Sequence, residues 1–180
     1  MKFKQRLLLI TTTLVLLMSA NSQAGRQGIN FYYGLGLGAS QTKFVDIMPT
    51  ADVVFGFEED GWALEAIAFG SLEVGTDDST VDTSMSGSHV GIAYRTIEKN
   101  NSWFKFKVSG TKMDVDDSDT TLDYKTKGNS YTIGYGIRMN REARLELDYS
   151  YYDSSDISEA VHMINARYFW GGSEYQGKDF

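Results

Sequence analysis

Charged residues recur at every second position within several apolar segments, so they would share one face of an extended strand. Lys105 and Lys107 alternate with phenylalanines, and Glu146 and Asp148 alternate with leucine and tyrosine. The residues placed in this way are Asp52, Glu58, Glu65, Arg95, Lys105, Lys107, Arg138, Glu146, Asp148 and Arg167. Opposite charges on one face can pair. The pattern predicts a structural ion-pair network or, alternatively, a gate in an ion path with Glu65, Lys105 and Arg138 as movable partners.

Few residues could act as a catalytic nucleophile or base. The chain has no cysteine and two histidines, His89 and His162. Ser88 precedes His89, and in a strand the two side chains would lie on opposite faces, too far apart to share a proton. His162 is followed by Met163 and Ile164. We therefore expect no enzymatic activity, no catalytic or metal-binding residue and no cofactor.

Acidic residues gather in three polar segments. They are Asp77, Asp78 and Asp82 in the first, Asp114, Asp116, Asp117, Asp119 and Asp123 in the second, and Asp153, Asp156 and Glu159 in the third. Carboxylates are ligands of calcium and magnesium, so these segments could bind divalent cations. However, Asp119 and Lys125 stand where an EF-hand loop that begins at Asp114 needs glycine and glutamate. Solvated loops are the simpler interpretation.

The N-terminal residues predict export from the cytoplasm. Lys2, Lys4 and Arg6 precede an apolar run at 7–18, and Ser22 and Ala24 suit a cleavage site, so we expect a signal peptide at 1–24. A membrane-anchoring helix is the alternative, but the run is shorter than the roughly 20 residues that a helix needs to cross a bilayer. Without 1–24 the chain has 14 basic and 24 acidic residues, a balance that argues against nucleic acid as a partner.

Eight later segments alternate apolar with polar or small residues, as strands do. They are 29–40, 51–57, 62–72, 88–94, 103–111, 131–139, 144–151 and 161–170. In the first segment, glycines alternate with aromatic and aliphatic residues, which leaves interior room for side chains from across a barrel. The third is irregular, because Ile67 and Phe69 lie opposite the face of Trp62, and we expect either a β-bulge near Glu65 or a short helix there.

The connections between these segments are of two kinds. Those at 58–61 and 140–143 are short, whereas those at 74–87 and 112–129 are long and polar. Short periplasmic turns and long extracellular loops are typical of an outer-membrane barrel. The sequence thus predicts an all-β fold, a closed antiparallel up-and-down eight-stranded transmembrane β-barrel. In so narrow a barrel the charged face would point inward and fill the lumen, with Arg138 and Glu146 meeting across their tight turn.

The signal peptide, the eight segments, the glycine-aromatic first strand and the run LELDYSYY at 145–152 together resemble the small outer-membrane barrels of the OmpA and OmpX type. The resemblance covers 25–170 and implies the outer membrane of a Gram-negative cell, with lipopolysaccharide, membrane lipid and the barrel assembly machinery as partners and a monomeric state. Members of this family commonly end on an aromatic strand residue. Here GGSEYQGKDF follows Trp170, so we expect a short periplasmic tail at 171–180 and no peptidoglycan-binding domain.

Three functions fit this architecture to different degrees. We expect a non-enzymatic barrel with a plugged lumen and acidic loops that serves envelope integrity or surface interaction. The alternative is a narrow, porin-like passive channel for ions or small solutes. The third is a lipid A modifying enzyme, but the His-x-Ser pair that a deacylase of this class carries is missing at both histidines.

Overall fold

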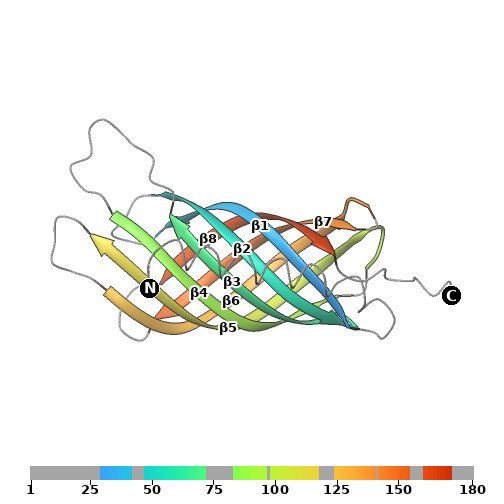
Figure 1. Cartoon of the computed structure of the whole chain (residues 1–180), viewed down its shortest axis with the longest axis horizontal. Helices are drawn as coiled ribbons and strands as arrows, with labels where there is room; N and C mark the ends of the chain where they lie inside the picture. Colours follow the sequence, from blue (N-terminus) through green and yellow to red (C-terminus); the bar gives the residue numbers. More distant parts are fainter. Residues whose placement is uncertain are drawn as a thin grey trace, which may run out of the picture.

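The structure is a computed structural model that describes residues 29–41, 47–71, 83–96, 98–117, 124–140, 142–154 and 160–171. Eight antiparallel strands follow one another in sequence order, and β1 pairs with β8 to close the sheet into a barrel (Figure 1). The strands are β1 (Asn30–Gln41), β2 (Met48–Glu59), β3 (Trp62–Ser71), β4 (Thr83–Arg95), β5 (Ser102–Asp117), β6 (Tyr124–Arg138), β7 (Ala143–Ser154) and β8 (Val161–Gly171). The predicted fold class is confirmed.

Strands β4, β5 and β6 are longer than the sequence pattern indicated. Asp114, which we expected in a loop, lies in β5 opposite Ser86 of β4 and Lys125 of β6. Alternation of apolar and polar residues ends where a strand leaves the apolar belt, but backbone pairing does not require apolar side chains and continues. The three strands therefore reach far at one end of the barrel, the left end in Figure 1.

Strand β3 is regular, so the predicted bulge and the alternative of a short helix are both wrong. Its residues pair one to one with β2 and β4 along its length. Trp62 and Leu64 face outward, whereas Ile67 and Phe69 are buried in the interior. The pattern misled because part of this interior is apolar, which gives a strand two hydrophobic faces.

Short turns join β2 to β3, β4 to β5 and β6 to β7 at what we call the turn end of the barrel. The first is Asp60 and Gly61, both with positive φ (49° and 82°), as in the two-residue hairpin turns that match strand twist. Neighbouring turns are hydrogen-bonded, since the Arg95 amide donates to the Gly61 carbonyl at 2.7 Å. The connections at the opposite end, the loop end, fall at 42–46, 72–82, 118–123 and 155–159, outside the described residues.

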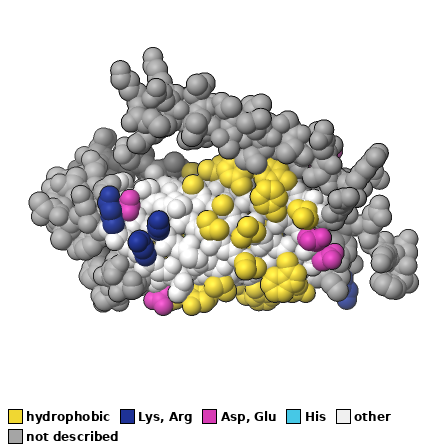
Figure 2. All heavy atoms as spheres, turned by 60° about the horizontal axis from the view of Figure 1, so that its bottom comes forward, with side chains coloured by type: hydrophobic (Ala, Val, Ile, Leu, Met, Phe, Trp, Pro, Cys, Tyr) yellow, Lys and Arg dark blue, Asp and Glu magenta, His cyan; other side chains and the backbone are white. Residues whose placement is uncertain are grey.

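The outward face of the barrel is an apolar belt. Figure 2 shows hydrophobic side chains across the middle of the molecule and charged side chains toward its two ends. The well-exposed members of the belt are Leu35, Leu37, Leu64, Val90, Ile92, Phe104, Phe106, Val108, Tyr131, Ile133, Tyr135, Leu147 and Ile164. Near the turn end, Trp170 stacks on Tyr33 (centroids 5.6 Å apart) and Trp62 packs on Tyr94 (4.9 Å). Such a belt is far larger than the apolar patches of soluble monomers and is typical of a barrel surface that faces lipid.

Among the described residues, no helix is long and apolar enough to cross a membrane.

Candidate functional site: the filled lumen

Ten charged side chains meet in the barrel interior, and we call them the charged network. They are Asp52, Glu58, Glu65, Arg95, Lys105, Lys107, Arg144, Glu146, Asp148 and Arg167, and all are buried. The set holds five acidic and five basic groups, so it is formally neutral. Buried charges are tolerated when they are paired in this way.

Arg95, at the end of β4, binds carboxylates from three other strands. Its Nε lies 2.8 Å from Glu146 of β7, its Nη2 2.6 Å from Glu65 of β3, and its Nη1 3.4 Å from Glu58 of β2. The Tyr32 hydroxyl donates to Glu65 at 2.7 Å. The planar guanidinium, with five N–H donors, suits such a multiple contact.

Lys105, on β5, forms the second junction of the network. Its Nζ lies 2.7 Å from Glu146, 2.9 Å from Asp148 and 3.4 Å from Glu65. Lys107 is two residues further along the same face, with its Nζ 3.3 Å from Glu65. The predicted alternation of β5 therefore places both lysines inside, as expected.

Arg167, on β8, joins this junction to the first strands. Its guanidinium pairs with Asp148 and, at 2.8 Å, with Asp52 of β2. Gly36 of β1 lies directly between β2 and β8, and a Cβ there would lie 2.8 Å from the Arg167 side chain. The glycines of β1 thus make room for interior side chains, but these come from the adjacent strands β2 and β8 and not, as the sequence pattern predicted, from across the barrel.

Sequence reasoning missed Arg144, a member of the network. Its Nη1 lies 2.7 Å from Glu58, and its guanidinium lies over the ring of Tyr32, 4.2 Å from the centroid. The signal was available, because Arg144 is two residues before Glu146 and so shares its face. It stands at the first position of the predicted segment 144–151, where alternation gives the weakest indication of the face.

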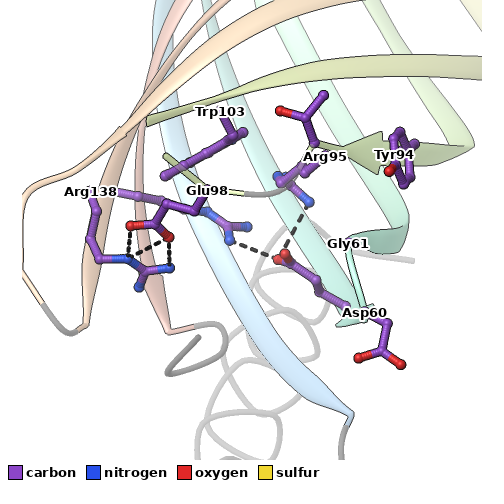
Figure 3. Close-up of a pocket in the computed structure, with 10 residues that line it drawn as sticks. Asp60, Gly61, Tyr94, Arg95, Glu98, Trp103 and Arg138 are labelled. Carbon is purple, nitrogen blue, oxygen red and sulfur yellow. Dashed lines mark hydrogen bonds and ion pairs between the residues drawn. The ribbon is translucent and has the colours of Figure 1, made fainter. Parts of the chain in front are cut away.

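Arg138 lies apart from the network at the turn end. It pairs with Glu98 of the β4–β5 turn, with Nη2 and Oε2 2.7 Å apart, and the pair is half-buried beside a small pocket (Figure 3). The register places Gly136 opposite Glu146 and Arg144 opposite Arg138. The expected Arg138–Glu146 partnership across the tight turn is therefore replaced by the Arg138–Glu98 pair. Trp103, in the space that Gly136 leaves, donates to Glu146 at 3.3 Å.

Apolar side chains gather in the barrel interior toward the loop end. We call this group the methionine cluster, and it consists of Met48, Phe69, Met85, Met113, Tyr152, Val161 and Met163. The Tyr152 hydroxyl donates to the Met163 sulfur at 3.7 Å. The sequence pattern did not reveal the cluster because our predicted strands began or ended short of Met48, Met85 and Met113.

The two histidines lie on opposite faces of the barrel wall. His89 is buried, with its Nδ1 3.3 Å from the Ser130 hydroxyl, while Ser88 faces outward as expected. His162 is exposed, and its Nδ1 lies 2.7 Å from the Tyr149 hydroxyl. Within the described ranges, no three acidic or histidine side chains group as metal ligands would.

Several sequence predictions lie outside the described residues. These are the signal peptide at 1–24, all of the predicted tail at 171–180 except Gly171, which ends β8, and most of the acidic loop residues, namely Asp77, Asp78, Asp82, Asp119, Asp123, Asp156 and Glu159.

The fold is that of known small barrels. Neisserial surface protein A superposes with a TM-score of 0.59 at 9% identity, over 80% of this chain and 97% of that one. Ail, the attachment invasion locus protein of Yersinia pestis, superposes with a TM-score of 0.55 at 8% identity, over 81% of this chain and 99% of that one. The outer membrane protein OprG from Pseudomonas aeruginosa superposes with a TM-score of 0.54 at 11% identity, over 81% of this chain and 96% of that one. At these identities the likeness shows the fold, a small eight-stranded barrel of the kind found in outer-membrane proteins.

At the level of sequence, neither a family model nor a curated protein matches the chain.

Proposed function

We propose that the protein is a non-enzymatic barrel of the Gram-negative outer membrane, exported by the signal peptide at 1–24, with a sealed lumen and a function in envelope integrity or surface interaction. The apolar belt supports the membrane placement, because its exposed Leu, Ile, Val and Phe side chains would be costly in water. The short connections at the turn end support a periplasmic position for that end.

The observation that carries the proposal is that two groups of buried side chains follow one another along the barrel interior. Toward the turn end, the charged network links β2, β3, β4, β5, β7 and β8 by ion pairs. Toward the loop end, the methionine cluster fills the interior with apolar side chains. An ion in transit would have to separate buried charge pairs and then cross an apolar constriction, and both steps are unfavourable.

A sealed lumen directs attention to the exterior and to the loop end. The barrel presents its longest strands, β4, β5 and β6, at that end. Two structural neighbours carry names that refer to the cell surface and to attachment, Neisserial surface protein A and the attachment invasion locus protein. These names support a surface role without identifying a partner.

Planar-bilayer conductance of the refolded protein from Gly25 to Phe180 tests the proposal. Folding is checked first by the heat-dependent shift of the barrel on a denaturing gel. We expect a folded barrel that produces no reproducible current steps. Reproducible steps from the folded protein would reject the sealed lumen and favour the narrow passive channel.

A further inference from the structure

A buried histidine lies against the methionine cluster. The ring of His89, which is 2% exposed, lies 6.0 Å from the ring of Phe69 and 5.7 Å from that of Tyr152, centroid to centroid, and both are members of the cluster. Its Nδ1 lies 3.3 Å from the Ser130 hydroxyl, whereas its Nε2 has no hydrogen-bond partner among the described residues. Buried polar atoms are nearly always paired, so an unpaired one calls for an explanation.

Three methionines of the cluster are as deeply buried as His89 and come from strands around it. Met85 is four residues before His89 on the same inward face of β4. The register of the neighbouring strand β5 places Met113 level with the midpoint between these two residues. Met163 of β8 accepts a hydrogen bond from Tyr152 at 3.7 Å, and the Tyr152 ring also contacts His89. The fold thus brings three thioether sulfurs and one unpaired imidazole nitrogen to the same part of the interior.

This set of donor atoms favours a soft, singly charged metal ion. Thioether sulfur and imidazole nitrogen suit Cu(I), whereas calcium, magnesium and manganese prefer carboxylate, carbonyl or water oxygens. Structural zinc sites usually include thiolates, and the methionine cluster contains neither a cysteine nor a carboxylate. The four donors are neutral, so a monovalent ion brings less charge into the buried site than a divalent ion would.

We propose that these three sulfurs, together with Nε2 of His89, bind Cu(I) inside the barrel. The Nδ1–H of His89 donates to the Ser130 hydroxyl, which orients the ring and leaves the Nε2 lone pair for the metal, as is usual for metal-binding imidazoles. Methionine side chains have three rotatable bonds, so their sulfurs can turn toward an ion without a shift of the backbone. The sequence predicted no metal-binding residue, because the methionines are far apart in the chain and come together only in the folded barrel.

Competition for Cu(I) between the refolded protein and the coloured chelator bicinchoninate, under anaerobic and reducing conditions, tests the site. One test variant is Met113→Leu with Met163→Leu, which removes two sulfurs at nearly constant volume. The other is His89→Gln, which keeps a hydrogen-bonding side chain. Met139→Leu is the matched control, because Met139 is 57% exposed near the turn end. We expect wild type and M139L to withdraw one Cu(I) per chain, and each test variant to bind it at least about 10-fold more weakly, since loss of an outer-sphere partner alone costs about 10- to 100-fold.

Equal competition by wild type and the double leucine variant would overturn the proposal, and so would bound Cu(I) that an equal concentration of Zn(II) displaces. The folding of each variant is checked by the heat-dependent gel shift. A second measurement on the wild type does not depend on the folding of any variant: Ag(I), a redox-inert ion of the same charge, is added while the isotope-labelled methionine methyl groups are followed by NMR. We expect the signals of Met85, Met113 and Met163 to shift and that of Met139 to stay.

A shift of the Met139 signal alone would show binding at the surface and would also overturn the proposal. The site goes beyond the proposed function, because it requires the folded interior and not the absence of conductance. A folded barrel that conducts would therefore reject the sealed lumen and leave the metal site standing, so the two failures are distinguishable.

Discussion

At the scale of single residues, Arg95 is the centre of the barrel interior. It contacts three carboxylates from three strands, and each of them is almost inaccessible to water. Their oxygens cannot turn to solvent if the guanidinium is removed. The contribution of Arg95 is therefore larger than the sum of ordinary surface ion pairs.

We expect Arg95→Met to lower the free energy of unfolding by about 3 to 5 kcal/mol, because it removes one of the cationic partners of each of three buried carboxylates. Arg138→Met is the matched control: its pair with Glu98 is partly exposed at the turn end, so we expect a loss of about 1 kcal/mol or less. Urea unfolding in phosphatidylcholine vesicles measures both. Adding Glu65→Gln to Arg95→Met should recover part of the loss, and equal losses in the two single variants would contradict this account.

At the scale of elements, strand β3 shows how a two-layered interior changes the sequence pattern of a barrel strand. Glu65 enters the charged network, whereas Phe69, four residues on, enters the methionine cluster. Both residues face inward, although one is charged and the other aromatic. The face of a residue is set by its parity in the strand and not by its polarity.

Ile67→Ala and Ile92→Ala test this placement on neighbouring strands. Both variants lose the transfer free energy of the removed carbon atoms, but lipid tails can fill the space at the exposed Ile92 and not at the buried Ile67. We expect Ile67→Ala to lower the free energy of unfolding by roughly 1 to 2 kcal/mol more than Ile92→Ala, because it leaves a cavity. The same vesicle assay measures the difference. Equal losses of unfolding free energy in the two variants would instead indicate a bulge that turns Ile67 outward.

The strands were predictable where alternation was strong, as in Phe104–Val108 and Tyr131–Ile137, because the lipid and the packed lumen impose opposite demands on adjacent residues. Strand ends were not predictable, since beyond the belt both faces can be polar while the backbone pairing continues. The alternation of faces along each strand predicted most members of the charged network, but it did not predict which of them form ion pairs. Arg95 contacts Glu65 and Glu146 because of the curvature of the barrel and the register of its strands. The sequence of a single strand specifies neither.

At the scale of the whole molecule, the charged network and the methionine cluster lie at different depths of the interior. The network is formally neutral and lies toward the turn end, beside buried apolar residues such as Tyr32 and Val54, whereas the methionine cluster lies toward the loop end. Water-soluble agents that enter from the loop end would therefore meet the methionine cluster before they reach the charged network. The methionines become internal reporters of whether that end is sealed.

Mild hydrogen peroxide treatment uses these reporters. Met139 is 57% exposed near the turn end, whereas Met85 and Met163 are 1% exposed within the cluster. We expect Met139 to be oxidised first and the four methionines of the cluster only after heat unfolding, because oxidation follows access to the sulfur. Peptide mapping by mass spectrometry gives the order. Early oxidation of Met85 or Met163 in the folded barrel would show that water enters the lumen.

Closure by β1 and β8 also brings together charges that are distant in the chain. Asp52 and Arg167 stand 115 positions apart in the chain, yet each needs the other inside the lumen. Until β8 pairs with β1, Asp52 has no Arg167 beside it. We therefore expect a sheet that lacks β8 to leave this carboxylate hydrated, so that burial of the pair accompanies closure of the barrel.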